Sequence, residues 1–295
     1  MLILNKKIYF VLVSLLFMVI ISIRLINAQI VSKEQESNNV INEFKSEEDK
    51  IISINFNNSI TGNYTFDNVK DDFKSTWADG VKEKRANIVD ENNKFLRIFY
   101  PKGHHGTDET GALWRTNFDE SYDELYMTYK IRFKENFDFV KGGKLPGLAG
   151  GEGNTGGNKP NGYDGWSARL MWRKNGAVVQ YVYYPDQTGK YADDFAWDKE
   201  DQKYFQPGKW HTITNYIKIN TLGKKDGEIL GWFDGELALE SKNLLFRNTD
   251  DFSIDQFQFS TFFGGSGDEW NTTQDEWVDF DDIKIYKKLE NKIYN

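Results

Sequence analysis

The sequence predicts an all-β fold, a single-domain β-jelly roll in which two antiparallel sheets pack as a sandwich. Aromatic residues make up 16% of the 295 residues, and they recur with β-branched residues in short alternating runs. Such runs are typical of strands that bury one face. Sequences rich in Gly, Pro, Asn and Asp separate the runs, and no stretch has a clear helical period. We therefore expect one sandwich from about residue 51 to 290, with one sheet curved so that it presents a concave face to a substrate.

The strands are expected, in chain order, at 52–56, 94–100, 125–133, a hairpin at 166–184, 210–219, 229–233, 238–240, 257–263 and 277–286. Turn sequences lie at 101–103, 207–208, 225–227 and 234–235. Between 141 and 165 no strand pattern is present, and eight glycines lie between 142 and 157. We expect a long functional loop there. Lys144 stands in it between a glycine pair and Leu-Pro, which should restrict its movement.

The stretch 166–184 predicts a β-hairpin, because apolar residues alternate on both sides of Asn175-Gly176. Two loop lengths are compatible with this pattern. A two-residue loop would pair Arg169 with Val182 and scatter polar side chains over both faces. A three-residue loop, with Gly176 at positive φ, would keep the apolar side chains of both strands together. Because a slip of one residue exchanges the two faces, burial favours the three-residue loop.

In that register one face of the hairpin is apolar and the other carries a compact polar group. The pairs that define it are Ser167 with Tyr183 and Arg169 with Tyr181. One cation, two phenols and one hydroxyl then share the face opposite the core. This group is too polar for a core, so we expect a ligand site there.

The first 28 residues have the features of a secretory signal peptide. Lys6-Lys7 precede an apolar run at 8–23, and Ile26-Asn27-Ala28 resembles a cleavage site. A retained membrane anchor is the alternative, because the run is long for a signal and short for a span. Three sequons agree with secretion by a eukaryotic route and begin at Asn57, Asn63 and Asn271.

Composition narrows the classes of partner. The chain has no cysteine, so it forms no disulfide and no cysteine-based metal site. Its formal net charge of −8 becomes −11 once residues 1–28, with three positive charges and no acid, are removed. An acidic protein is a poor non-specific binder of nucleic acid or anionic membrane. We expect a secreted monomer, with a flexible polar linker at 29–50 and a short tail at 291–295.

Three sequence blocks, in this order and spacing, resemble polysaccharide lyase family 14. They are G-G-K-L-P-G-L at 142–148, S-A-R-L-M-W-R at 167–173 and Y-V-Y-Y-P at 181–185. Weaker similarities follow at 207–211, 232–235, 260–266 and 280–286, so the resemblance spans about residues 95–287. The Gly/Asn-rich stretch 152–165 departs from the family pattern. Members of this family are lyases of alginate and of other polyuronates.

The resemblance implies a jelly roll whose concave sheet holds a uronate among five side chains, with no cofactor and no metal. Those side chains are Lys144, Ser167, Arg169, Tyr181 and Tyr183. Four of them are implied to be catalytic: Lys144, Arg169, Tyr181 and Tyr183. Three residues are candidates for substrate contact: Ser167, Lys141 and His105. The partner implied is an acidic polysaccharide.

The chemistry of a lyase explains these residue types. Such an enzyme removes the C5 proton of a 4-linked uronate and expels the 4-oxygen, so charge develops on the neighbouring carboxylate. The fork of Arg169 can hold that carboxylate at two points. Tyr183 is the leading base and acid, and Lys144 is the competing base or carboxylate neutraliser. A tyrosine base needs a nearby cation to lower its pKa, and Tyr181 and Ser167 would position the substrate.

Two other groups have a possible chemical and a simpler structural interpretation. His104 and His105 follow a strand, but neighbours on an extended chain point apart, which disfavours joint metal binding. His211 lies at a strand start, where we expect a structural role. The acidic stretch 267–282 lacks the spacing of a calcium loop, and we expect a solvated acidic loop there.

Three functions compete on this sequence. The first is a secreted lyase acting on alginate or glucuronan. The second is a non-catalytic lectin-like module, which the same sandwich and its aromatic residues would also support. The third, a glycoside hydrolase, needs two facing carboxylates, and the expected polar face has none. The identity of the uronate and the mode of cleavage, internal or terminal, stay open.

Overall fold

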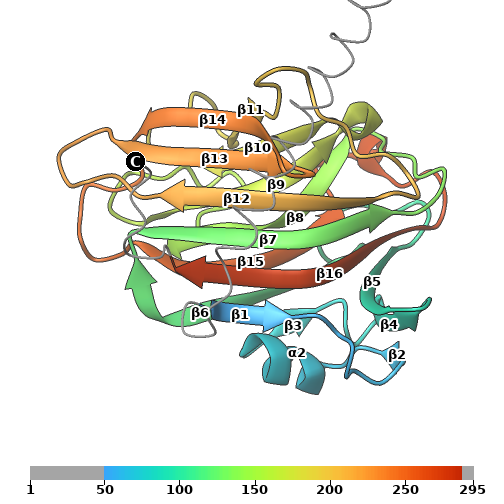
Figure 1. The fold of residues 1–295 in the computed structure, drawn as a ribbon. Coiled ribbons are helices and arrows are strands. Elements are labelled where there is room, and N and C mark those ends of the chain that lie inside the picture. Colours follow the sequence, from blue (N-terminus) through green and yellow to red (C-terminus); the bar gives the residue numbers. More distant parts are fainter. Residues whose placement is uncertain (1–49, 288–295) are drawn as a thin grey trace, which may run out of the picture. The chain divides into compact units, whose positions relative to one another are not determined.

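The computed structural model describes residues 50–287, which form two antiparallel sheets packed face to face (Figure 1). This confirms the predicted all-β sandwich. The elements are β1 (Lys50–Ile54), β2 (Gly62–Asn63), α2 (Phe66–Phe73), β3 (Ala78–Asp79), β4 (Ala86–Asp90), β5 (Lys94–Tyr100), β6 (Ala112–Tyr122), β7 (Glu124–Phe133), β8 (Gly142–Gly151), β9 (Gly165–Arg173), β10 (Val178–Tyr183), β11 (Asp193–Ala196), β12 (Trp210–Lys218), β13 (Gly227–Phe233), β14 (Glu236–Leu244), β15 (Ile254–Phe263) and β16 (Glu276–Lys287).

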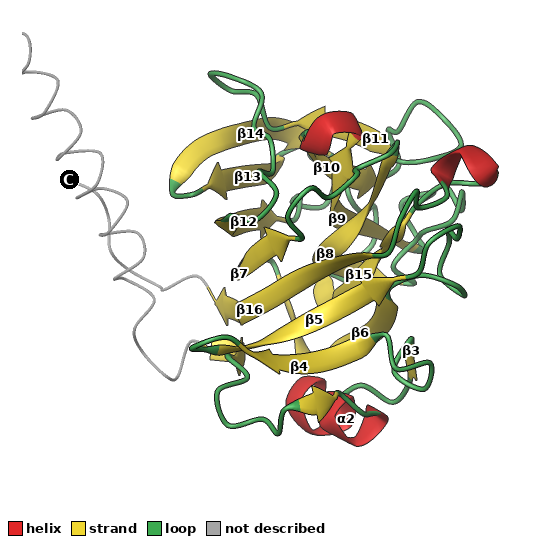
Figure 2. Cartoon of the chain, turned by 90° about the vertical axis from the view of Figure 1, so that its right-hand side faces the viewer, coloured by secondary structure: helices red, strands yellow, loops and turns green. Residues whose placement is uncertain are grey.

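One sheet has nine strands and the other has seven. The nine-stranded sheet runs β14-β13-β12-β7-β16-β5-β4-β2, with β1 also paired to β16. The seven-stranded sheet runs β11-β10-β9-β8-β15-β6-β3. Strands distant in the chain are therefore neighbours, as with β8 and β15, whereas consecutive strands such as β9 and β10 pair as hairpins (Figure 2).

The predicted signal peptide, the linker up to residue 49 and the tail at 291–295 lie outside the described residues. Within residues 50–287, no helix has the length and apolar character needed to cross a membrane.

The inner faces of both sheets meet in one continuous core of buried side chains. Strand β7 illustrates why, because its buried residues alternate with partly exposed ones. Aromatic rings fill much of the space between the sheets. Trp114 of β6 stacks on Phe259 of β15 with ring centroids 3.9 Å apart, and Phe259 meets Phe280 of β16 across the core at 5.1 Å. This packing leaves the outer faces of both sheets for other functions.

The hairpin of β9 and β10 has the predicted three-residue loop. Ser167 lies opposite Tyr183 and Arg169 opposite Tyr181. A short 3₁₀ turn at Lys174–Gly176 connects the strands, with Gly176 at φ 84°. This is the register that burial was expected to favour. In it, Trp166 and the apolar residues at alternate positions after it along β9 are fully buried in the core.

The prediction of an unstructured loop from 141 to 165 is wrong for its first half. Residues 142–151 form β8, a central strand between β9 and β15, and only 152–164 is loop. The glycines reflect close packing: a Cβ at Gly143 would overlap the ring of Trp172, and one at Gly147 would overlap the backbone of β9. Pro146 lies at a bulge, where the missing N–H costs no ladder hydrogen bond.

Helix α2 and the strands β2, β3, β4, β6 and β11 were not predicted either. Helix α2 has only eight residues and buries only Val69 and Phe73, so its periodic signal is short. Its start is fixed by a capping box between Thr65 and Asn68. Strand β6 has an apolar alternation only in its first half and a polar second half. Figures 1 and 2 place α2 beside the short strands β2 and β3 at one edge of the sandwich.

Candidate active site

The predicted catalytic residues converge on the outer face of the seven-stranded sheet. Neighbouring strands place them in rows: Lys144 of β8 faces Met171 of β9, and Arg169 of β9 faces Tyr181 of β10. Ser167 and Tyr183 form the next row. Three of these residues, Met171, Tyr181 and Tyr183, belong with Val179 to a small apolar cluster separate from the main core.

Lys144 is the most unusual ion of this face. Only 8% of it is exposed, and its Nζ lies 3.7 Å from the centre of the Tyr181 ring and 2.7 Å from Sδ of Met171. Within residues 50–287 no carboxylate forms an ion pair with it. Burial, followed by the nearby charge of Arg169, holds the pKa of Lys144 well below its usual range. The site thus contains an amine that loses its proton easily.

Arg169 is a second buried cation without a carboxylate partner among the described residues. It is 4% exposed, its Nη1 donates to Ser260 Oγ at 3.1 Å, and its Nε has no hydrogen-bond acceptor. Burial lowers the pKa of Arg169 to about 10. An unpaired buried guanidinium is costly, so its presence favours a site that receives an anion.

The two tyrosines lie edge to face, with ring centroids 5.6 Å apart. Tyr183 accepts a hydrogen bond from the Gly157 N–H at 2.9 Å and is 1% exposed. Burial, and then the neighbouring Tyr183, raises the pKa of Tyr181 despite the opposing effect of Arg173 and Arg169. The expectation that the cations lower the phenol pKa is therefore not met for Tyr181, because desolvation outweighs the two arginines.

The loop 152–164 covers one end of this face. Ser167 is fully buried, and its Oγ donates to the carbonyl of Asn154 at 2.6 Å. Gly157 contacts Tyr183 from the same loop. Ser167 therefore has no open path to a substrate while the loop is in this position.

Lys141 and His105 lie beyond the other end of the strands. Lys141 is half exposed and pairs with Glu269 at 3.2 Å. The Nδ1 of His105 is 2.7 Å from Oδ1 of Asn271. Both residues therefore meet the segment 268–271, which lies beside the start of β8 rather than over Arg169.

The remaining titratable groups of the sequence analysis take separate partners. His104 lies 3.3 Å from Glu109, away from the partner of His105. His211 is buried and bonds Asp234, a structural role as expected. The expected solvated acidic loop is wrong for the second half of the stretch 267–282, because residues from Glu276 onward form β16. There Asp279 is buried and pairs with two arginines, and Asp282 pairs with a lysine. Among the described residues no group of three or more His, Asp or Glu side chains could hold a metal ion.

Several residues of this face were not predicted. Ser260 of β15 bonds Arg169 from a strand bulge, and Arg115 of β6 donates to the carbonyl of Glu152. Met171 of β9 shares the face with Arg169 and lies opposite Lys144. The sequence could have indicated this position of Met171, because it alternates with Arg169 along one strand. Ser260 and Arg115 reach the site through strand pairing that the sequence does not reveal.

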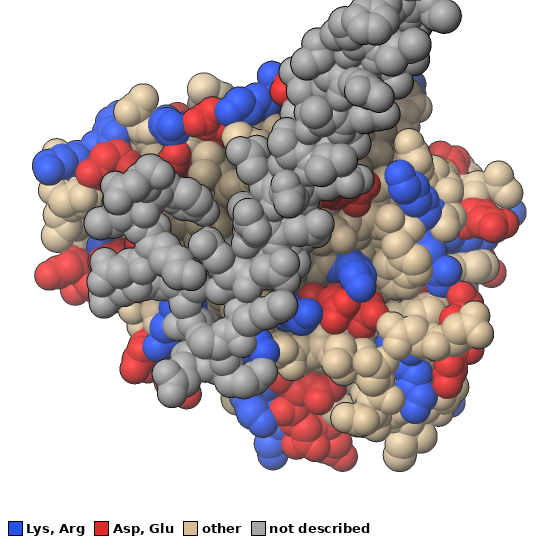
Figure 3. Space-filling model, viewed as in Figure 1, with Lys and Arg blue, Asp and Glu red and all other residues tan. Residues whose placement is uncertain are grey.

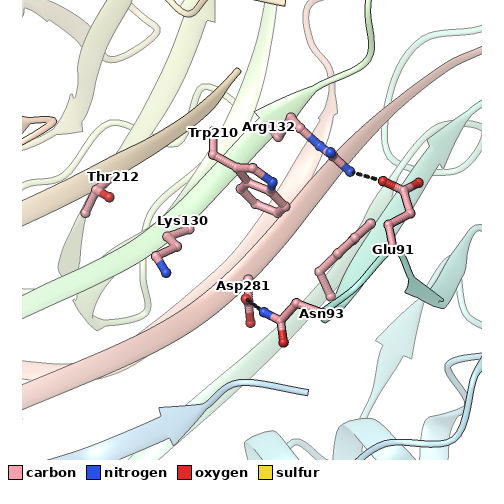
Figure 4. A pocket seen from close by; sticks show the side chains of 8 residues that line it. Glu91, Asn93, Lys130, Arg132, Trp210, Thr212 and Asp281 are labelled. Atoms are coloured by element: carbon pink, nitrogen blue, oxygen red, sulfur yellow. Dashed lines mark hydrogen bonds and ion pairs between the residues drawn. The ribbon is translucent and has the colours of Figure 1, made fainter. Parts of the chain in front are cut away.

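A pocket of about 260 Å³ lies on the opposite side of the sandwich, on the outer face of the nine-stranded sheet (Figure 4). Its lining residues are Glu91, Asn93, Phe95, Lys130, Arg132, Trp210, Thr212 and Asp281. Arg132 pairs there with Glu91, and Asn93 donates to Asp281. Basic and acidic side chains are interspersed over this view of the molecule (Figure 3). Because both of its cations are already paired, Arg132 with Glu91 and Lys130 with Asp282, this pocket is a weaker anion site than the face with Arg169.

Comparison with known proteins identifies the family and supports the fold. Residues 89–283 match the family model "Polysaccharide lyase 14". The structure of alginate lyase Aly36B is 29% identical, with a TM-score of 0.70 over 81% of this chain and 98% of that one. The alginate lyase of Aplysia kurodai is also 29% identical, with a TM-score of 0.69 over 81% of this chain and 99% of that one.

A curated relative is Exolysin of Paramecium bursaria Chlorella virus 1, which is 28% identical over 193 residues. The match covers 56% of this chain and only 30% of that protein. The family match alone covers well over half of the chain, in the region that contains every residue of the polar face. The chain therefore belongs to polysaccharide lyase family 14.

Proposed function

We propose that this protein cleaves alginate, a 4-linked polyuronate, by β-elimination. The observation that carries the proposal is the pair of buried cations, Lys144 and Arg169, without an ion-pair partner among residues 50–287 and beside two phenols. The two relatives above are named alginate lyases. Two variant structures of Aly36B, with a lysine and either a tyrosine or a methionine replaced by alanine, contain an alginate tetrasaccharide and trisaccharide.

In this proposal Arg169 and Lys144 bind the uronate carboxylate. Loss of the C5 proton places negative charge on that carboxylate, and donors already fixed around it stabilise the charge without reorganising. The unpaired Nε of Arg169 is such a donor. Because burial excludes water, each charge interaction there is stronger than at a surface.

Proton transfer then needs a base at C5 and an acid at the 4-oxygen. Electrons of the broken C5–H bond form the C4=C5 double bond as the C4–O bond breaks, and the departing oxygen receives a proton. Tyr183 is our leading candidate for both transfers. Lys144 is the competing base, since its lowered pKa makes the free amine available. Tyr181 and Ser167 support these groups, and Lys141 and His105 contact the substrate further along.

The test is the ultraviolet absorbance of the unsaturated product, measured with polymannuronate, polyguluronate and glucuronan. We expect Lys144→Ala, Arg169→Ala and Tyr183→Phe to reduce kcat/KM by at least about 100-fold each. The exposed Lys242→Ala is the control and should retain full activity. Near-native turnover in all three variants would refute the site. Binding of the polymers without product would instead support the lectin-like alternative.

The two roles of Lys144 can be separated by Lys144→Arg. Arginine keeps the charge but does not lose its proton in the accessible pH range. If Lys144 neutralises the carboxylate, the variant should retain measurable activity. If Lys144 is the base, it should be as inactive as Lys144→Ala.

We also propose that the protein is secreted, on the basis of the signal-like first 28 residues and the sequons. Asn57 and Asn63 are exposed in the structure, as glycosylation would require. Expression of the full chain in a eukaryotic host, with N-terminal sequencing of any product in the medium, tests this. A product retained in the membrane fraction with an intact N-terminus would support the anchor instead.

A further inference from the structure

Access to the polar face is graded along the strands. From the loop 152–164 outward, the exposed fraction is 0% for Ser167, 1% for Tyr183, 4% for Arg169, 6% for Tyr181 and 8% for Lys144. The register explains this order, because Ser167 lies near the end of β8 that continues into the loop, and Lys144 near the other end. The loop 152–164 covers the Ser167 end of this face, so we expect a polymer to reach the site from the Lys144 end.

Trp270 lies at that open end. A Cβ on Gly265 would overlap its indole, so the ring packs directly on the backbone of that glycine. The preceding Gly264 is next to Lys144, because a Cβ there would lie 3.6 Å from Nζ of that lysine. Trp270 is thus about one backbone step from Lys144, although it is distant in sequence, and it remains partly exposed.

The charges around Trp270 are already compensated. Lys141 lies 5.5 Å from the centre of the indole ring and pairs with Glu269. Arg173, at the same end of β9, makes two hydrogen bonds to Asp194. The ions here therefore offer little net attraction to a second carboxylate, and the apolar ring is the feature that remains for recognition. Sugar rings have an apolar face of C–H groups that packs on such a ring.

We infer that Trp270 is a substrate-binding residue, on which the sugar next to the one held by Lys144 and Arg169 stacks. The inference rests on the proposed function of the face. The inference extends the proposed substrate site by one subsite, at the Lys144 end only. It assigns to the loop 152–164 the role of closing the other end.

The experiment uses alginate oligosaccharides of increasing length with Trp270→Ala and Trp270→Phe. We expect Trp270→Ala to lower kcat/KM about 10-fold for oligomers long enough to reach the ring, through KM rather than kcat. The shortest cleaved oligomer should be unaffected, and Trp270→Phe should recover most of the loss. Trp77→Ala removes another exposed tryptophan and is the matched control.

Binding by calorimetry in the inactive Lys144→Ala background keeps the inference separate from catalysis. There, Trp270→Ala should weaken the affinity for long oligomers about 10-fold, with little dependence on salt because no charge is lost. An equal loss at all lengths, an unchanged affinity, or a lowered melting temperature that accounts for the loss would overturn the inference. If the wild type forms no unsaturated product but this binding difference is found, the lyase proposal fails and the Trp270 inference stands.

Discussion

Two residues of the candidate site carry a cost in stability. Lys144 and Arg169 are buried cations without carboxylate partners in the described part of the chain, and such ions oppose folding. Their neighbours Met171 and Tyr181 offer a sulfur atom and a ring face, which are weak substitutes for a carboxylate. This cost at one face is the reason that we propose it as the substrate site.

Lys144→Met should separate stability from activity. The variant removes a buried charge and keeps the volume, so we expect a melting temperature higher by about 2–4 °C, or about 1 kcal/mol, together with loss of lyase activity. Differential scanning calorimetry and the absorbance assay measure the two effects. A variant that is both less stable and inactive would show that the lysine contributes to folding.

The stability difference should also depend on pH. The folded-state pKa of Lys144 is below its unfolded value, so the wild type has its full penalty at a pH below the folded pKa, where both the folded and the unfolded state are protonated. Above the folded pKa the buried amine is neutral, while the lysine of the unfolded state still holds its proton. Raising the pH toward the ordinary lysine pKa removes the proton from the unfolded state and so stabilises the fold. The advantage of Lys144→Met should therefore shrink between neutral pH and about pH 10. A constant difference would argue against a lowered pKa.

At the scale of elements, loops and strand pairs position these residues. The β9–β10 turn sets which side chains share the outer face, and its two central residues differ in what they tolerate. Asn175 is at φ 62°, a conformation that asparagine and glycine both accept. Gly176 is at φ 84°, and a Cβ there would lie 2.8 Å from the ring of Phe139.

Gly176→Ala should accordingly destabilise the protein by about 2 kcal/mol, through positive φ and overlap with Phe139. Asn175→Gly, in the adjacent position, should change the free energy of unfolding by less than about 0.5 kcal/mol. Urea denaturation of both variants measures this. Equal effects at the two positions would contradict the turn geometry.

The outer face of the nine-stranded sheet is held by a network across β5, β7 and β16. Asp279, which is 1% exposed, pairs with Arg97 at 2.7 Å and with Arg132 at 2.7 Å. The two guanidinium groups also lie on aromatic rings, at 4.9 Å from Trp277 and Trp210. Arg132 and Trp210, which line the pocket in Figure 4, therefore contribute to the stability of this sheet.

Asp279→Asn should therefore reduce the free energy of unfolding by about 3 kcal/mol, because two partly buried arginines lose their shared anion. Glu91 still pairs with both, which limits the loss. The expected fall in melting temperature is about 6–12 °C, with kcat/KM unchanged below the transition. A loss of activity at low temperature would show that the two sheets are coupled more closely than their separate outer faces indicate.

At the scale of the whole molecule, one core joins both sheets. Buried side chains from strands of both sheets belong to a single cluster, in which Trp114, Phe259 and Phe280 connect one sheet to the other. The polar face and the ion-pair network lie on opposite outer faces of this core. If one sheet unfolded, the inner face of the other sheet would therefore lose its packing partner.

Residues 50–287 should consequently unfold in one transition. Far-ultraviolet circular dichroism and tryptophan fluorescence should give coincident curves in urea, because the buried tryptophans of the seven-stranded sheet, Trp114, Trp166 and Trp172, pack in the core that both sheets share. Two separated transitions would show that the sheets are independently stable, contrary to the continuous core.

The sequence by itself determined the fold class, the hairpin register and the set of polar side chains on its outer face. These follow from local alternation and turn chemistry, which act over a few residues. Ser167, Arg169, Tyr181 and Tyr183 could be assigned to one face from the alternation of the two strands and the length of the turn alone. The resemblance to family 14 added Lys144 on a short motif.

Only the tertiary structure decided that the glycine-rich stretch containing Lys144 is a central strand, since its glycines are needed for close contact with β9 and with the distant β15. It also decided the burial of Ser167 under the loop, the contact of Ser260 with Arg169 and the position of Trp270 beside Lys144. Each of these depends on pairing between segments that are far apart in the chain, and no periodicity within a segment specifies its distant neighbour.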